Sequence, residues 1–195
     1  DMRAQFAAYA QAEARLGKLL DAEGLDGLDE LVDDILARSE ASMRRAILSV
    51  PEGTYTDEIH LDGFDQPLVI RCAVTVKGGE ILVDYTGTSD QIARPINSVM
   101  SYTLAYTHYA LKCLFDPATP NNDGTFRPIK VVAPEGCLVN PRFPAPTGFG
   151  NHLSDQIAAV IMMALAPAVP RQVTACWSKR RNTISAVAEQ PWWRM

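Results

Sequence analysis

The sequence has 195 residues, of which 47% are hydrophobic and 21% are charged, with a formal net charge of −5. This composition is ordinary for a globular protein, and the length is enough for one domain with a sizeable core. The negative charge comes from residues 1–40, where ten acidic and four basic side chains give −6, so nucleic acid and anionic membrane are disfavoured as partners.

The cysteines argue against a disulfide scaffold or a zinc site. Four of them lie far apart, without a CxxC pair or a Cys/His cluster at zinc spacing: Cys72, Cys113, Cys137 and Cys176. Reduced thiols in a cytoplasmic protein are therefore expected. The sequence shows no signal peptide and no apolar run of transmembrane length. It begins with Asp1, inside a helical pattern, which suggests a piece of a longer polypeptide.

Two helices are predicted at the N-terminus. Apolar residues recur at helical spacing over residues 1–23 and again over residues 25–50, with Gly24 as a C-terminal cap and Pro51 as a stop. The short connection at residues 24–27 predicts that the two helices pack as an antiparallel hairpin. Glu40 and Arg44 are expected on the helix surface or between helices.

Strands follow the two helices. Alternating patterns predict strands over residues 54–61, 68–76 and 80–85, and Lys77-Gly78-Gly79 favours a tight hairpin between the last two. A short strand is predicted over residues 129–132, and helices over residues 97–114 and 154–165. The apolar side of the first of these helices is read as Val99, Leu104, Ala105, Tyr109 and Leu114. That of the second is read as Ile157, Val160, Ile161, Ala164 and Leu165. Asn151 or Ser154 is expected to cap the second helix.

These elements predict an α+β fold. It consists of an N-terminal helical hairpin, an antiparallel β-meander and further helices packed on the sheet.

The stretch of residues 80–97 is the most informative part of the chain. A predicted strand ends at Asp84 and runs into Thr86-Gly87-Thr88-Ser89-Asp90, followed by Asn97. A carboxylate and several hydroxyls at a strand end can line a pocket. The same groups can instead cap their own turn, and the sequence leaves both interpretations open.

The blocks VDYTGTS, RPIN and NNDGTFRPIKVVAPEGCLVNP resemble the hydantoinase B/oxoprolinase family. Members of this family act on cyclic amides such as hydantoins and 5-oxoproline, and relatives occur among the acetone and acetophenone carboxylases. The resemblance covers residues 1–175, read as a partial domain, and leaves residues 176–195 as a divergent or disordered tail.

The resemblance implies part of the hydrolytic subunit of an ATP-dependent cyclic-amide hydrolase. The resemblance also implies a hetero-oligomer with a hydantoinase A-like partner subunit that binds ATP. This chain itself contains no phosphate-binding loop motif. A divalent metal is expected upstream in the parent and not in this chain. Two alternatives stay open: an ATP-dependent ketone carboxylase subunit, and a non-catalytic scaffold or subunit-contact fragment that docks through its acidic helices.

Candidate site residues follow from the same blocks. Asp84 and Ser89 are predicted to be catalytic. A second group is predicted to bind substrate: Thr86, Thr88, Asn97, Asn121 and Arg127. Arg127 suits a carboxylate or imide oxygen, but it could equally tie its loop to a nearby acid. His60 and His108 are read as packing or surface residues, and His152 with Asp155 forms only a weak metal pair. No motif supports a triad of Ser89, His152 and Asp84.

Overall fold

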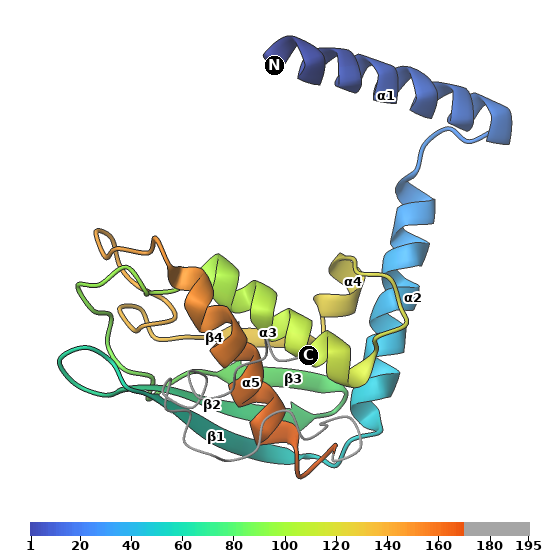
Figure 1. Ribbon diagram of the computed structural model, residues 1–195. Coiled ribbons are helices and arrows are strands. Elements are labelled where there is room, and N and C mark those ends of the chain that lie inside the picture. Colours follow the sequence, from blue (N-terminus) through green and yellow to red (C-terminus); the bar gives the residue numbers. More distant parts are fainter. Residues whose placement is uncertain (170–195) are drawn as a thin grey trace, which may run out of the picture.

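The computed structural model describes residues 1–169, and the predicted tail lies outside these residues (Figure 1). A four-stranded sheet carries helices on one face, which confirms the α+β class. The strands are β1 (Gly53–Leu61), β2 (Leu68–Lys77), β3 (Glu80–Asp84) and β4 (Ile129–Val132). The helices are α1 (Met2–Glu23), α2 (Asp29–Leu48), α3 (Met100–Phe115), α4 (Asp123–Phe126) and α5 (Ser154–Leu165), with a 3₁₀ turn, η1, at Gly150–Leu153.

The sheet has the order β1-β2-β3-β4. Its first three strands form the predicted antiparallel meander, and the β2–β3 hairpin turns at Gly78 and Gly79, which both have positive φ as a tight hairpin requires. The fourth strand lies parallel to β3, with Ile81 opposite Ile129. A parallel neighbour needs a crossover connection, and α3 and α4 lie within it.

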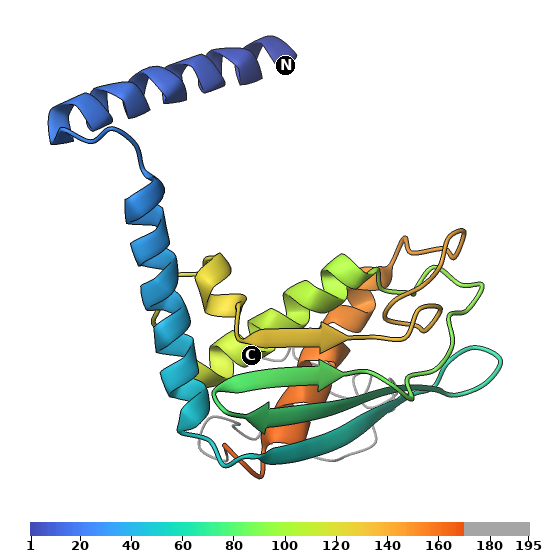
Figure 2. The ribbon, with the colours of Figure 1, turned by 180° about the vertical axis from the view of Figure 1, so that it is seen from behind.

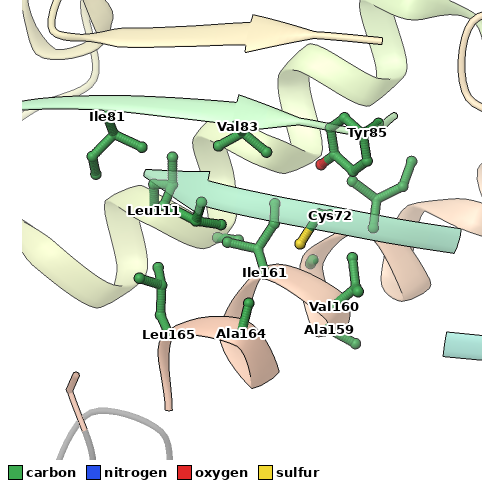
Figure 3. Packing of buried hydrophobic residues seen from close by; sticks show 14 of the residues in the cluster. Cys72, Ile81, Val83, Tyr85, Leu111, Ala159, Val160, Ile161, Ala164 and Leu165 are labelled. Atoms are coloured by element: carbon green, nitrogen blue, oxygen red, sulfur yellow. The ribbon is translucent and has the colours of Figure 1, made fainter. Parts of the chain in front are cut away.

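The core lies between the sheet and the helices α3 and α5 (Figures 1 and 3). Alternate residues of β2 are buried, and the side of α5 predicted to be apolar is buried as well. Tyr85, at the end of β3, is fully buried and hydrogen-bonds Thr107 of α3 over 2.7 Å. The alternating sequence pattern of β2 thus correctly predicted that every second side chain of this strand faces the core.

The prediction for the buried side of α3 was right for Leu114, which is buried, but wrong for Tyr109. Tyr109 is 58% exposed, whereas the buried residues include Thr103 and Thr107. Each threonine hydroxyl donates to a carbonyl: Thr103 to Val139 over 2.6 Å and Thr107 to Thr103 over 2.7 Å. Because these hydroxyls are satisfied, the threonines can occupy the core and the more apolar tyrosine faces outward.

The helices α1 and α2 form where predicted, and Gly24 caps α1 in the left-handed conformation. They do not pack as an antiparallel hairpin. The first helix buries no residue and projects away from the rest of the structure (Figures 1 and 2). Residues 24–28 turn the chain through a corner instead of reversing it, so the apolar side of α1 does not meet that of α2.

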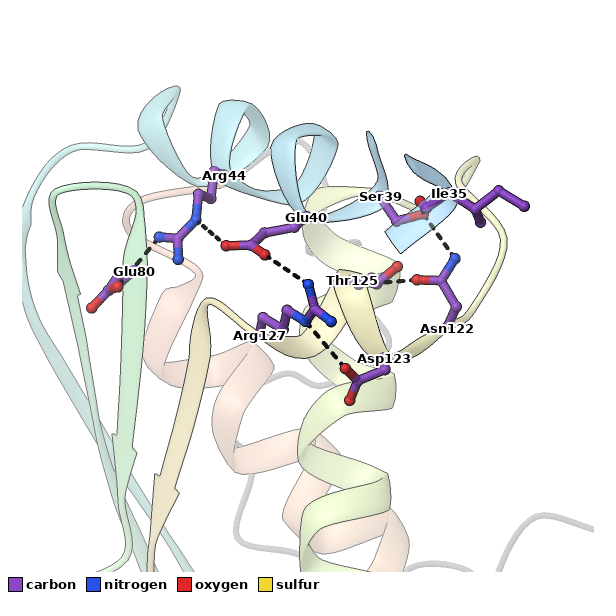
Figure 4. A network of polar contacts seen from close by, with 9 residues as sticks. All are labelled: Ile35, Ser39, Glu40, Arg44, Glu80, Asn122, Asp123, Thr125 and Arg127. Carbon is purple, nitrogen blue, oxygen red and sulfur yellow. Dashed lines mark hydrogen bonds and ion pairs between the residues drawn. The ribbon is translucent and has the colours of Figure 1, made fainter. Parts of the chain in front are cut away.

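The second half of α2 is attached to the sheet and to α4 (Figure 4). Asn122 caps α4 and donates to Ser39 over 2.8 Å, and Gly124 packs so closely on α2 that a Cβ would lie 2.1 Å from the Leu36 oxygen. Arg44 joins Glu40 of its own helix to Glu80 of β3, at 2.9 and 3.3 Å. These contacts fix residues 35–48 while the first turns of α2 stay exposed.

None of the helices within residues 1–169 combines the length and the apolar character needed to cross a membrane.

Candidate functional site

Loops and helix N-termini gather at one end of the sheet, called here the loop end. It comprises residues 62–67, 85–99 and 133–150, together with the first turns of α3 and α5 (Figures 1 and 2). The 85–99 loop is joined to the 133–150 loop by backbone bonds, including Leu138 N–H to Ser89 O at 2.8 Å and Ser98 N–H to Leu138 O at 2.9 Å. The predicted polar stretch therefore lies in a cross-linked cluster of loops.

Asp84 ends β3 and caps the turn that follows. Its Oδ1 accepts hydrogen bonds from the backbone N–H of Thr86 at 2.8 Å and from the Thr86 hydroxyl at 2.7 Å. Among the described residues, its Oδ2 has no hydrogen bond, and the side chain is partly exposed. Asp84 therefore holds the turn with one oxygen and leaves the other without a partner among the described residues.

Thr88 and Ser89 extend the sheet by side-chain bonds to β2. The Thr88 hydroxyl accepts from Arg71 N–H at 3.2 Å and donates to Arg71 O at 3.1 Å, so both of its functions are used. The Ser89 oxygen accepts from Val69 N–H at 2.8 Å, which leaves its own proton for another acceptor. Asp84 and Ser89 thus both retain free hydrogen-bonding capacity, as do the Thr86 hydroxyl, which can still accept, and the exposed Asp90.

Asn97 is fully buried and ties the loops together. Its Oδ1 accepts from Ile92 N–H at 2.9 Å. Its Nδ2 lies 2.8 Å from Ile92 O, 3.0 Å from Arg94 O and 2.8 Å from Pro146 O. With its amide occupied on both sides, Asn97 shapes the loop end and has no polar atom left for a substrate in this conformation.

A small hollow of about 280 Å³ opens beside the N-terminus of α3. Its lining residues are Val99, Tyr102, Thr147, Gly148 and Gly150. A Cβ added at Gly150 would lie 2.5 Å from the backbone oxygen of Asn97, so glycine is needed for this close approach. The start of α3 carries the positive end of its helix dipole, which favours an oxygen atom or an anion in the hollow.

Two serine hydroxyls at this end are buried without a partner among the described residues. Ser98 precedes α3, and Ser154 is the first residue of α5. Leu153 takes the cap position of α5 and makes no side-chain cap bond, so Ser154 does not cap the helix as predicted. Buried hydroxyls usually find a partner, so these two stand out as unsatisfied polar groups at the starts of α3 and α5.

Asn121 and Arg127 lie at the opposite end of the sheet from this group. Arg127 pairs with Asp123 at 3.1 Å and with Glu40 at 3.5 Å (Figure 4). Asn121 is exposed and precedes α4 by two residues. The structure therefore brings Asp84, Thr86, Thr88, Ser89 and Asn97 together and separates the other two from them. The Arg127 contacts correspond to the second of its two predicted roles.

The histidines take separate positions. His60 is exposed and contacts Glu58 at 3.0 Å, and Glu58 also pairs with Arg71. His108 stacks on Phe126 with ring centroids 4.4 Å apart, and burial lowers its pKa. His152 is exposed, and no hydrogen bond joins it to Ser89 or Asp84 among residues 1–169. In the same residues, no three His, Cys, Asp or Glu side chains gather to hold a metal.

The residues around the hollow are not predicted by the sequence pattern. Helical spacing places Tyr102 within a helix, and it assigns no role to Thr147-Gly148-Phe149-Gly150. Gly148 and Gly150 lie just before the helix predicted from residue 154, and glycines in this position are a weak signal for close approach of two backbone segments. The pairing of this segment with α3 does not follow from spacing, because the two are far apart in the chain.

The sheet and the cross-linked loop end define an α+β domain with a polar pocket region. The chain belongs to the hydantoinase B/oxoprolinase family, whose profile matches residues 1–195.

Relatives support this assignment. The chain is 39% identical over 189 residues to a protein of Pseudomonas sp. (strain NS671) named as the putative B subunit of a D-/L-hydantoinase. The matched region covers 90% of this chain and 32% of that protein. It is 27% identical over 184 residues to the beta subunit of caprolactamase from Pseudomonas jessenii, covering 91% of this chain and 31% of that one. The chain thus spans about a third of the length of these relatives.

Two solved structures resemble the fold. The ATP-dependent caprolactamase from Pseudomonas jessenii superimposes with a TM-score of 0.78 at 26% identity, over 88% of this chain and 30% of that chain. A nucleotide-free acetone carboxylase superimposes with a TM-score of 0.59 at 14% identity, over 67% of this chain and 20% of that one. The second likeness concerns the fold alone.

Proposed function

We propose that this chain is part of the hydrolytic subunit of an ATP-dependent enzyme that opens cyclic amides. The observation that carries the proposal is the likeness to caprolactamase, at a TM-score of 0.78 over 88% of the chain. Caprolactam, hydantoin and 5-oxoproline share a ring amide, so one pocket chemistry can serve all three. Two relatives are themselves named as subunits, which supports a partner subunit, and we propose that this partner is hydantoinase A-like and binds ATP.

Opening a ring amide needs a water, a base and a stabilised oxygen. Water attacks the carbonyl carbon, the C–N bond breaks, the ring nitrogen gains a proton, and a carboxylate is formed. We propose that the free Oδ2 of Asp84 accepts a proton from water and that the Ser89 hydroxyl, whose proton is unused, donates to the carbonyl oxygen. Thr86 bonds Asp84 directly, whereas Thr88 bonds the backbone of β2 and Asn97 bonds the backbone of the neighbouring loops.

A divalent metal does not fit among the described residues, because they form no cluster of three ligands.

The test uses the full-length parent subunit with its ATP-binding partner. Ring opening of caprolactam, hydantoin and 5-oxoproline is measured with ATP for wild type, Asp84→Asn and Asp84→Ala. The asparagine retains an oxygen that can accept from Thr86, so the turn should survive while the charge is lost. We expect kcat to fall by about 10²-fold or more in both variants. Undiminished turnover in Asp84→Asn with an unchanged unfolding midpoint would refute the role of Asp84.

An ATP-dependent carboxylation of a ketone is the alternative reaction. The fold likeness to acetone carboxylase keeps it open, although this likeness says nothing about substrate. Incorporation of labelled bicarbonate, assayed beside ring opening on the same preparation, separates the two reactions.

A further inference from the structure

The helix α1 presents an apolar seam that nothing in the described structure covers. Its residues are spaced four and three apart, as in the a and d positions of a coiled coil: Met2, Phe6, Tyr9, Leu16 and Leu20, with Glu13 at the remaining position. Met2, Phe6 and Tyr9 are 69%, 63% and 68% exposed. In proteins most of the stability of a helix comes from packing of its apolar face, so an uncovered seam of this kind indicates a partner helix.

The seam leads into a strongly acidic corner. Residues 21–34 contain seven acidic side chains and no basic one. A hollow of about 760 Å³ lies between the end of α1 and the start of α2. Four carboxylates and two leucines are among its lining residues: Asp26, Asp29, Glu30, Asp34, Leu25 and Leu31. The apolar surface continues along α2 through Val32 and Ile35, which are 44% and 46% exposed.

The charge restricts what can cover this surface. A second copy of the chain would bring two such acidic corners to the same interface, and like charges there oppose association. Packing inside one domain core would desolvate several unpaired carboxylates, which is costly. A separate chain can instead cover the apolar seam and leave the carboxylates at a polar rim, paired with lysine or arginine.

We infer that α1 and the first half of α2 form a docking surface for a basic amphipathic helix of the partner subunit. The apolar face of that helix lies along the seam from Met2 to Leu20, and its lysines or arginines enter the acidic corner. This inference rests on the proposed function only in assuming a partner subunit. It concerns assembly, so it can fail while the ring-opening activity is established, and it can hold if the reaction is a carboxylation.

The experiment uses the 195-residue chain and fluorescein-labelled peptides of about 20 residues, the length that spans the α1 seam. The peptides tile the ATP-binding partner subunit and, as a second set, the remaining part of the parent subunit. Binding is followed by fluorescence anisotropy at two salt concentrations, and self-association of the chain is measured by sedimentation. The variant Phe6→Glu places a charge in the seam, and Ala8→Glu places the same charge on the same exposed helix outside the seam.

A second pair of variants tests the charge. Asp29→Lys with Asp33→Lys reverses two charges in the corner, and Asp62→Lys with Asp65→Lys makes the same net change at the loop end. All variants should keep the wild-type urea midpoint, because the substituted side chains lie outside the core.

We expect the tightest peptides to come from the partner subunit and to be basic and amphipathic. Phe6→Glu should weaken them by about tenfold or more, and Ala8→Glu should not. Reversal at Asp29 and Asp33 should weaken binding several-fold and flatten its salt dependence, unlike the control pair. Three results would overturn the inference: tightest binding by peptides of the parent itself, equal effects of Phe6→Glu and Ala8→Glu, or a dimer of the chain that Phe6→Glu dissociates.

Discussion

The guanidinium of Arg127 lies 3.5 Å from the Glu40 carboxylate, so a residue just before β4 is tied to the middle of α2. Glu40 also accepts from Arg44 at 2.9 Å, and this bond lowers the pKa of its carboxyl group. Charged residues thus link α2, α4 and β3 at the end of the sheet away from the loop end (Figure 4).

Arg127→Ala tests whether this link is the only role of Arg127. Since the pairs are largely exposed, we expect the free energy of unfolding to fall by no more than about 1 kcal/mol. The KM for a cyclic amide in the assembled enzyme should stay unchanged, with Glu40→Ala as the matched control. A raised KM in Arg127→Ala alone would instead support the predicted substrate clamp.

Gly124→Ala should be strongly destabilising. The added Cβ would lie 2.1 Å from the backbone oxygen of Leu36, so α4 must separate from α2. We expect a loss of about 2 kcal/mol or more in urea unfolding. Gly17→Ala is the control, because nothing lies within 4 Å of its added Cβ and alanine favours a helix by about 1 kcal/mol. Equal midpoints for the two variants would contradict the close packing of α4.

Asn97→Asp should be at least as damaging as Asn97→Ala. The new oxygen would face the carbonyls of Ile92, Arg94 and Pro146, which now surround Nδ2 at 2.8–3.0 Å. Placing a carboxylate against buried carbonyls is more destabilising than only removing their donor. We therefore expect Asn97→Asp to lower the free energy of unfolding by about 3 kcal/mol or more. Urea unfolding at pH 7 measures both variants. A near-neutral Asn97→Asp would mean that the loop end does not depend on this amide.

Cys72 should make stability fall at alkaline pH. Burial, reinforced by the charge of Asp57, raises the pKa of its thiol from 9.0 to about 12. Because the unfolded chain loses this proton first, the contribution is complete below pH 9 and is lost as pH rises toward 12. The slope approaches about 1.4 kcal/mol per pH unit.

Cys72→Ala provides the comparison for this pH dependence. Slopes of the free energy of unfolding are compared between about pH 8 and pH 10, since the alanine also leaves a cavity that shifts the absolute value. Tyr85, whose pKa burial also raises, contributes at higher pH in both proteins. An identical slope with and without Cys72 would show that its thiol does not titrate differently in the two states.

Local patterns predicted the elements well. The buried side of α5, the meander and the cap at Gly24 follow from spacing and from glycine, and all three are confirmed. The buried side of α3 could be found only in part in this way, because Thr103 becomes a core residue only through Val139, which is far along the chain. The predicted arrangement of α1 and α2 was also wrong, because apolar spacing identifies an apolar face without saying what covers it.

The candidate site was predictable only where its residues lie close together in the sequence. Asp84, Thr88 and Ser89 are close in sequence, so their gathering at a strand end followed from the pattern. Arg127 is separated from them because β4 runs parallel to β3, and Arg127 precedes the strand instead of following it. The sequence predicted β4 as a strand but contained no signal for its direction.

The parallel pairing of β3 with β4 also bears on how the chain folds. Ile81 meets Ile129, a partner far along the chain, whereas the β2–β3 hairpin closes over two glycines. Because closing a long loop costs more entropy than closing a short one, the meander can form before β4 arrives. The fourth strand brings α4 with it, so the attachment of α2 through Asn122 and Gly124 would be completed last.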